Sequence, residues 1–261
     1  MAKQNISNDK QEKEVLEPLR DDIAPEVKVP ADWTPKTSLG RDVVNGTITH
    51  IDQILDNGLV ILEDQITESL LQLDSELLMV GQAKGKFGGG QRRVFRQTQK
   101  KTREGNKPKF TTMAVVGNKD GYVGLGFGKS KETVPAREKA IKQAKLNVFK
   151  ISRGAGSWES NSKEPTSIPF SVTGKCGSVQ ITLMPAPKGK GLCVEKECQK
   201  ILELAGIKDV WSKTQGQTKN KINLIKACES ALKKLVSTKV RDDELSGIAY
   251  QEGHVKVLQN E

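Results

Sequence analysis

The sequence is poor in the residue types from which metal centres and covalent active sites are built. It holds four cysteines and two histidines in 261 residues. No two cysteines have C-x-x-C spacing and no histidine lies near one, so neither a zinc site nor a disulfide framework is indicated, as is usual for reduced cytosolic proteins. His50 and His254 stand in no pattern that pairs a base with a nucleophile. We therefore predict a protein that is not an enzyme, with no catalytic residue, no metal site and no cofactor.

Long apolar runs are missing as well. No stretch approaches the roughly 20 consecutive apolar residues that span a bilayer, and the polar start Met-Ala-Lys-Gln-Asn-Ile-Ser is not that of a signal peptide. We expect a soluble, cytoplasmic protein with no membrane partner. A nucleotide-binding loop is also missing, because Val123 stands where that motif needs a glycine five residues before Gly128-Lys129. We expect no small-molecule substrate.

Positive charge is in excess, and it is unevenly distributed. The net charge is +10, yet residues 1–76 hold 7 Lys and Arg against 16 Asp and Glu, whereas residues 77–261 hold 35 against 16. A basic body of this size predicts a polyanionic partner. The alternative is a basic surface that only keeps the protein soluble. We expect the acidic first part to pack on the protein's own body or on basic neighbours.

The densest group of cations lies between Lys84 and Lys109. It contains ten basic residues and one acidic residue, Glu104. Glycines within the segment interrupt regular structure, so the pattern predicts an irregular loop whose Phe87 and Phe95 stack on bases or anchor the loop. The alternative is a disordered, solvated charge run.

A hairpin and a basic helix follow this segment. Asp120-Gly121 between two apolar runs is a strong hairpin signal. Alternation along the return strand, residues 122–128, places three glycines on one face and Val123, Leu125 and Phe127 on the other. We predict that the apolar face packs and that the glycine face lets RNA approach closely. The helix after Pro135 is predicted to turn Ala136, Ala140, Ile141, Ala144 and Val148 inward and Arg137, Lys139, Lys142 and Lys145 outward.

The C-terminal half predicts a second α+β region. Its expected elements are paired strands at 168–172 and 178–184 joined by a turn at 173–177, a helix at 192–204, a strand from Asp209 and a helix at 222–236. Lys188-Gly189-Lys190-Gly191 before the first of these helices suggests an anion site, with RNA phosphate as the favoured ligand. The alternative is an ordinary turn.

Three motifs resemble the small-subunit ribosomal protein five family. They are V-V-G-N-x-x-G-Y-V-G-x-G-x-G-K-x-K-E from Val115, G-S-V-x-I-T-L-M-P-A-P-x-G-x-G-L from Gly177, and L-E-L-A-G-I-K-D-V-W-S-K-T-x-G-Q-T from Leu202. The resemblance runs in order from about Trp33 to Leu235 and favours the archaeal and eukaryotic branch. Some archaeal relatives carry cysteines near the tryptophan that resembles Trp158, but this chain does not, so no metal is expected there.

The resemblance implies an α+β fold in which a double-stranded-RNA-binding-like domain precedes a β-β-α-β-α domain. We expect these divisions: a flexible tail at 1–31, an acidic extension at 32–65, the first domain at 66–150, a linker at 151–165, the second domain at 166–237 and a C-terminal tail at 238–261. The implied function is that of a structural constituent of the small ribosomal subunit. The implied partners are small-subunit ribosomal RNA, messenger RNA near the channel by which it enters, and the neighbouring small-subunit proteins four and eight, in support of decoding accuracy. The alternative function is a free-standing double-stranded-RNA-binding protein.

Basic residues and the glycine face supply the predicted RNA-binding site, and in the family the loop between the first two strands contacts ribosomal RNA. In the first half the candidates are Lys84, Lys86, Arg92, Arg93, Arg96, Lys100, Lys101, Arg103, Lys107, Lys109, Gly124, Gly126, Gly128, Lys129, Lys131, Arg137, Lys142 and Lys145. In the second half they are Arg153, Lys175, Lys188, Lys190, Lys213, Lys219 and Lys221.

Overall fold

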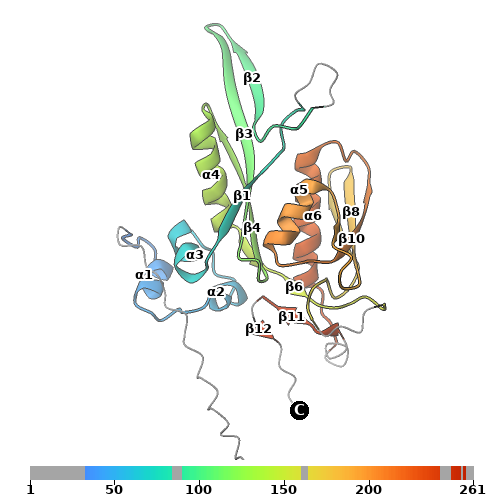
Figure 1. Ribbon diagram of the computed structural model, residues 1–261. Helices are drawn as coiled ribbons and strands as arrows, with labels where there is room; N and C mark the ends of the chain where they lie inside the picture. Colours follow the sequence, from blue (N-terminus) through green and yellow to red (C-terminus); the bar gives the residue numbers. More distant parts are fainter. Residues whose placement is uncertain (1–32, 84–89, 160–163, 242–247, 254, 257–261) are drawn as a thin grey trace, which may run out of the picture.

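The computed structural model describes residues 33–83, 90–159, 164–241, 248–253 and 255–256. They form a first sheet covered by one long helix and a second sheet covered by two helices. A group of short helices from the N-terminal part of the chain packs beside the first sheet (Figure 1). Within these residues, none of the helices has the length and apolarity that a membrane span requires. The α+β class predicted from the sequence is confirmed.

The strands of the first sheet pair antiparallel. They are, in spatial order, β1 (Asp74–Leu78), β3 (Gly105–Gly117), β4 (Tyr122–Ser130) and β5 (Val148–Lys150), with β2 (Arg96–Thr102) paired to the free half of β3. The predicted hairpin is confirmed as β3–β4. Its turn places Lys119 and Gly121 at positive φ, and the Asn118 side chain accepts hydrogen bonds from the N–H groups of Asp120 and Tyr122.

The glycine face of β4 is covered by α4 (Thr133–Leu146). Gly124, Gly126 and Gly128 are all buried, and a methyl group added at Gly126 would stand 2.0 Å from the carbonyl oxygen of Ala140. The close approach predicted for this face is therefore real, but the approaching backbone is the protein's own helix. The prediction that these three glycines contact RNA is wrong, because α4 packs where RNA was expected.

The opposite face of β4 packs as predicted except near its end. Val123 and Leu125 are buried, whereas Phe127 is 44% exposed. Phe127 pairs with Met113 of β3, beyond the point where β5 ends. The periodicity of the strand indicates which face a residue occupies, but not how far the covering layer extends.

The second sheet is mixed. Its strands are, in spatial order, β7 (Val172–Cys176), β8 (Val179–Pro185), β10 (Val210–Gln215) and β9 (Leu192–Cys193), with the last pair parallel. Its helices are α5 (Lys196–Leu204) and α6 (Lys221–Ser237). The predicted first strand and turn are misplaced, since most of the expected turn, residues 173–177, belongs to β7. Gly174 indicated a turn, but it allows α6 to approach, since a methyl group added there would stand 2.0 Å from the carbonyl oxygen of Ala227.

The two sheets share one apolar core. Leu78 and Val115 of the first sheet belong to the same buried cluster as Leu204 of α5. At the junction the Glu197 carboxylate accepts a hydrogen bond from the Met79 N–H at 2.7 Å. The two α+β regions expected from the sequence are therefore packed into one body.

The acidic extension and the first residues of the predicted first domain form three short helices. They are α1 (Ser38–Val44), α2 (Asp52–Asp56) and α3 (Asp64–Leu70). Ile54 and Ile66 pack in a separate cluster with Tyr122 and Val148 of the first sheet, and the Tyr122 hydroxyl donates to the Asp52 carboxylate at 2.8 Å. The expectation that this acidic part packs on the protein's own body is confirmed.

Parts of the predicted linker and C-terminal tail pair with one another. β6 (Ser152–Arg153) pairs with β11 (Gln251–Glu252), which pairs in turn with β12 (Val255–Lys256). The Arg153 side chain is buried, where it pairs with Asp120 and donates to the carbonyl oxygen of Gly253 at 3.0 Å. The predictions of a free linker and a loose tail are therefore wrong at these residues. Pairing between segments about 100 residues apart leaves no local signal in the sequence.

Candidate nucleic-acid interface

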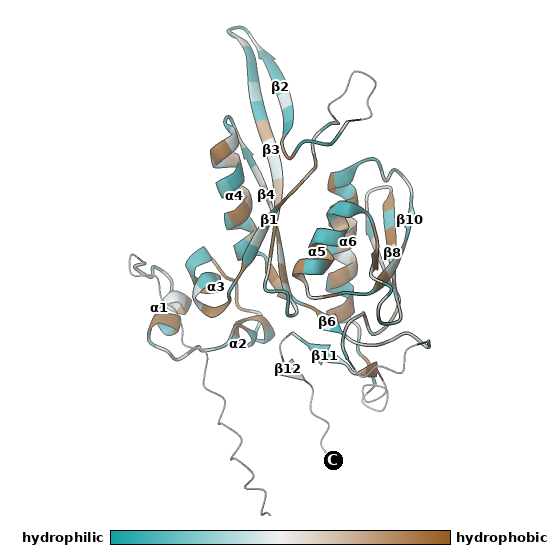
Figure 2. Cartoon of the chain, viewed as in Figure 1, coloured by the Kyte–Doolittle hydropathy of each residue, from teal (hydrophilic) through white to brown (hydrophobic). Residues whose placement is uncertain are grey.

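Most of the segment expected to be an irregular basic loop is a β-hairpin. β2 pairs with the first half of β3 from Arg96 opposite Thr111 to Thr102 opposite Gly105. At about 3.3 Å per residue, seven paired residues extend about 20 Å. The hairpin extends beyond the rest of the first sheet (Figure 1), and its tip is hydrophilic (Figure 2). The predicted Lys84 and Lys86 lie outside the described residues.

The hairpin brings like charges together. Lys100 lies directly opposite Lys107, and both residues are exposed. Like charges in this position destabilise a strand pair. Lys107 also pairs with Glu104 at 2.7 Å, but an ion pair between exposed side chains offsets little of the repulsion between the two lysines. An external polyanion would stabilise this arrangement, and the exposed strands offer it a long contact surface.

A second group of cations surrounds the start of α4. Lys109, Lys129, Lys131 and Lys139 line a hollow of about 520 Å³ in which Glu132 is the one carboxylate. None of these four lysines forms an ion pair with another described residue. The positive end of the α4 dipole adds to their field. The hollow extends the predicted site to Lys139, which the helical pattern already placed on the outer side.

Three of the predicted RNA-binding cations form ion pairs with carboxylates of the protein itself and are largely buried. Arg153 is buried, so the prediction that it contacts RNA is wrong. Lys145 pairs with Glu68 of α3 and Lys221 pairs with Glu195, and each lysine side chain is only 17% exposed. Their partners lie in other elements, which is why sequence position alone marked these lysines as free.

Two other predicted lysines have acidic partners but stay exposed. Lys142 pairs with Asp64 at 3.3 Å and keeps 59% of its side chain exposed, while Lys188 pairs with Glu164 at 2.7 Å and keeps 53%. The hydrogen bond and charge of Lys188 lower the pKa of Glu164. Lys188 remains a predicted RNA contact, whereas Lys142 lines a hollow with the carboxylates of Glu63, Asp64 and Glu68, which makes RNA contact at that position unfavourable.

The predicted anion site at residues 188–191 already holds a carboxylate. The Asp209 Oδ1 atom accepts hydrogen bonds from the N–H groups of Gly189 at 3.0 Å and Gly191 at 2.8 Å. The helix also begins later than expected, at Lys196 after the cap Glu195. The prediction of a phosphate site on this backbone is wrong, because the protein supplies its own anion.

Most remaining predicted cations are exposed, and they stay predictions. They are Arg93, Arg96, Lys100, Lys101, Arg103, Lys107, Lys109, Lys129, Lys131, Arg137, Lys175, Lys190, Lys213 and Lys219. Arg92 is half-buried and donates to the carbonyl oxygens of Gly81 and Lys219, both at 3.4 Å. It therefore links the base of the basic segment to the loop between β10 and α6.

One cationic face was missed. Lys226, Lys233 and Lys234 line a shallow hollow of about 430 Å³ on the outer side of α6. Lys233 pairs with Glu229 and lies 5.1 Å from the centre of the Phe149 ring. The spacing of seven and eight residues, which repeats on one side of a helix, is the signal that could have found this face.

No cluster of metal-ligating side chains accompanies these cations in the part of the chain that the structure describes. No group of three or more His, Cys, Asp or Glu residues there could hold a metal ion. Cys198 and Cys228 are buried, and the hydrogen bond with Cys228 together with burial raises the pKa of the Cys198 thiol. They fill the core, as small apolar side chains do.

An α+β body with an exposed cationic hairpin and a lysine-lined hollow has the construction of a nucleic-acid-binding protein. Comparison with known proteins agrees with that class. The family model for the N-terminal domain of ribosomal protein S5 matches residues 94–152, and that for its C-terminal domain matches residues 174–244.

Archaeal relatives are similar over most of the chain. Small ribosomal subunit protein uS5 of Nanoarchaeum equitans is 48% identical over 225 residues, which cover 86% of this chain and 96% of that protein. The protein of the same name from Methanocaldococcus jannaschii is 43% identical, with coverage of 86% and 97%. That from Pyrobaculum calidifontis is 45% identical, with coverage of 77% and 93%. The chain therefore belongs to the ribosomal protein S5 family.

Proposed function

We propose that the chain holds small-subunit ribosomal RNA through the β2–β3 hairpin and the lysine-lined hollow at the start of α4. Family membership makes it a structural constituent of the small ribosomal subunit rather than an enzyme, with ribosomal RNA and ribosomal proteins as partners. The observation that carries the RNA interface is the pairing of Lys100 with Lys107 on an exposed hairpin. Such a pair costs folding energy that a phosphate backbone would offset.

The proposal extends to finer partners. These are messenger RNA near the channel by which it enters the subunit, and the small-subunit proteins four and eight, with a contribution to decoding accuracy in the cytoplasm. The resemblance of the three sequence motifs supports this part.

The RNA interface is tested by neutralising hairpin cations. The variant carries Lys100→Gln, Lys107→Gln and Lys109→Gln. The control carries Lys196→Gln, Lys208→Gln and Lys239→Gln, which remove the same charge from other exposed positions. Binding to a small-subunit RNA fragment is measured across salt concentrations. We expect the salt slope of the variant to become shallower by roughly 0.7–0.9 for each phosphate contact that the substitutions remove.

The control separates a local interface from general attraction to a basic surface. An unchanged slope in the variant, or an equal loss in the control, would contradict the proposed interface. The free-standing alternative is tested by sucrose-gradient fractionation after a high-salt wash. We expect the protein to migrate with the small subunit, whereas release into the free fraction would favour the alternative.

A further inference from the structure

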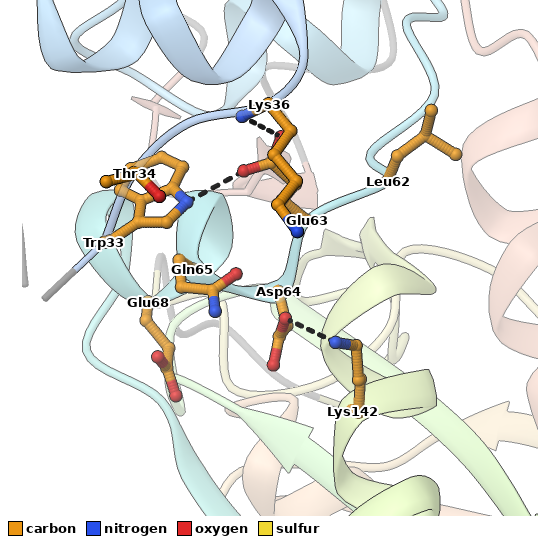
Figure 3. Close-up of a pocket in the computed structure, with 9 residues that line it drawn as sticks. All are labelled: Trp33, Thr34, Lys36, Leu62, Glu63, Asp64, Gln65, Glu68 and Lys142. Carbon is orange, nitrogen blue, oxygen red and sulfur yellow. Dashed lines mark hydrogen bonds and ion pairs between the residues drawn. The ribbon is translucent and has the colours of Figure 1, made fainter.

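The acidic extension has a groove that RNA binding does not explain. It lies between residues 33–36, the start of α3 and the outer side of α4, and its volume is about 550 Å³ (Figure 3). Three carboxylates (Glu63, Asp64 and Glu68) and two lysines (Lys36 and Lys142) line it, together with Trp33 and Leu62.

One wall of the groove is held by a single carboxylate. Glu63 accepts hydrogen bonds from the indole Nε1 of Trp33 at 2.8 Å and from the N–H groups of Lys36 at 3.0 Å and Thr37 at 2.7 Å. Burial opposes ionisation of Glu63, but these hydrogen bonds outweigh it and lower its pKa. Glu63 therefore stays charged at neutral pH and keeps the Trp33 ring beside α3.

The charges of the groove disfavour RNA. The three carboxylates that line the groove outnumber its two lysines, and residues 33–76 hold eight acidic residues against two basic ones. Asp64 forms an ion pair with Lys142 at 3.3 Å, as Figure 3 shows, and Glu68 pairs with Lys145. With Glu63 also ionised, a phosphate in this groove would lie within the roughly 8 Å over which like charges repel at physiological salt. A cationic side chain fits these surroundings better.

Apolar side chains are exposed next to the groove. Val60 is 75% exposed, Leu62 66% and Leu59 46%, all within the connection between α2 and α3, whereas Ile61 between them is buried. A lone exposed apolar residue is ordinary, but a contiguous group marks an interaction surface. The surface thus combines an apolar rim with an acidic groove.

We propose that this surface binds an extended segment of a neighbouring protein in the small subunit. Apolar side chains of that segment cover Leu59, Val60 and Leu62, and an adjacent lysine or arginine enters the groove beside Glu68. Trp33 lines the groove and is half-buried, and its indole ring is the aromatic partner that such a cation would contact. The inference rests on membership of the small subunit and is independent of the RNA interface on the hairpin.

Site-specific photocrosslinking in purified small subunits tests the occupant. A benzophenone amino acid replaces Leu62 in the full-length chain, and the control places it at Val134 of α4, which is 64% exposed and lies outside the groove. We expect the probe at position 62 to crosslink a ribosomal-protein peptide with a lysine or arginine beside apolar residues, and the control not to reach that peptide. A crosslink to RNA, a crosslink to a peptide without a cation, or no crosslink overturns the proposal.

Assembly competition gives a second test. Val60→Asp with Leu62→Asp is mixed with wild-type protein during subunit assembly. The control is Val44→Asp, at an exposed position at the end of α1 that lines neither the groove nor the lysine-lined hollow. We expect incorporation of the double variant to fall about tenfold, as the removal of one strongly bound interface residue would produce, with affinity for naked RNA unchanged. Equal incorporation, or a parallel loss of RNA affinity, overturns the proposal. An unaltered salt slope in the hairpin variant would reject the proposed RNA interface and would leave the groove proposal standing.

Discussion

Gly126 shows how a single residue sets the distance between a helix and a sheet. A side chain at this position would collide with the α4 backbone, which cannot yield as a flexible side chain can. Overpacking a buried site costs roughly 1–3 kcal/mol and occasionally more. We expect Gly126→Val to lower the free energy of unfolding by about 3 kcal/mol, as measured by urea denaturation followed by circular dichroism.

Lys119→Ala is the matched control for this substitution. Lys119 lies in the β3–β4 turn, and its pKa is raised by a hydrogen bond and ion pair with Asp74 at 2.6 Å. Because both side chains are exposed, we expect a much smaller loss of stability. Equal stability of Gly126→Val and Lys119→Ala would show that α4 does not approach β4 as closely as described.

Glu63 predicts a pH dependence in the acidic extension. Its pKa is lower in the folded protein than the ordinary 4.5, so the unfolded chain takes up the proton first as pH falls. The stabilisation is therefore complete above about pH 4.5 and is lost as pH falls through the folded-state pKa. We expect the Trp33 segment to detach from Glu63 in that lower range.

Fluorescence isolates this transition. Trp158→Phe and Trp211→Phe leave Trp33 as the one tryptophan, and its emission is followed on acidification from neutral pH. Adding Glu63→Gln removes the titrating group, so the change below pH 4.5 should disappear. An identical pH profile with and without Glu63→Gln would assign the change to other carboxylates.

The β2–β3 hairpin is an element that adds binding surface without adding core. Every residue of β2 except Thr102 is exposed, and Thr102 is half-buried. Thr98 and Lys109 lie directly opposite each other, so residues 99–108 can be replaced by Asn-Gly, which forms a two-residue hairpin turn. We expect the thermal midpoint to change little and the affinity for ribosomal RNA to fall, with a shallower salt slope.

The outcome of the shortening separates two roles for the element. A stable protein with weakened RNA binding supports a hairpin that serves contact alone. A large drop in the thermal midpoint would mean that the hairpin also supports the sheet, and undiminished RNA affinity would remove it from the proposed interface.

At the scale of the whole molecule, the shared core predicts that both sheets unfold together. Leu78 of β1 is completely buried in the cluster that includes Ile201 of α5. Leu78→Ala should cost roughly 2–5 kcal/mol because burial is reduced and a cavity is left behind. We expect Trp33 and Trp211, studied in separate single-tryptophan backgrounds, to report the same shifted urea midpoint.

Coincidence of the two reporters is the decisive observation. Trp33 belongs to the extension that packs on the first sheet, and Trp211 belongs to β10 of the second. If Leu78→Ala shifted the Trp33 transition but left that of Trp211 in place, the two regions would be independent folding units, as the sequence alone suggested.

The predictions from sequence were accurate where the signal is local. The β3–β4 turn and the helices α4 and α6 follow from turn residues and apolar spacing, which act over a few positions. Errors occurred where one residue type serves two purposes. Glycine is a residue typical of turns, but Gly174 lies within β7, where the absence of a side chain allows α6 to approach the strand. The α1 helix was missed, although Thr37 accepts the capping hydrogen bond of Gly40.

The sequence by itself determined the family, the α+β class and the basic character of the region after residue 76, because motifs, periodicity and composition are properties of the chain. Only the tertiary structure decided which cations face solvent. Lys145 meets a carboxylate 77 positions away, Arg153 is buried, and Asp209 accepts hydrogen bonds from the N–H groups of Gly189 and Gly191. Whether a charge is available depends on the partners that folding brings within a few ångströms, and no local pattern records those distances.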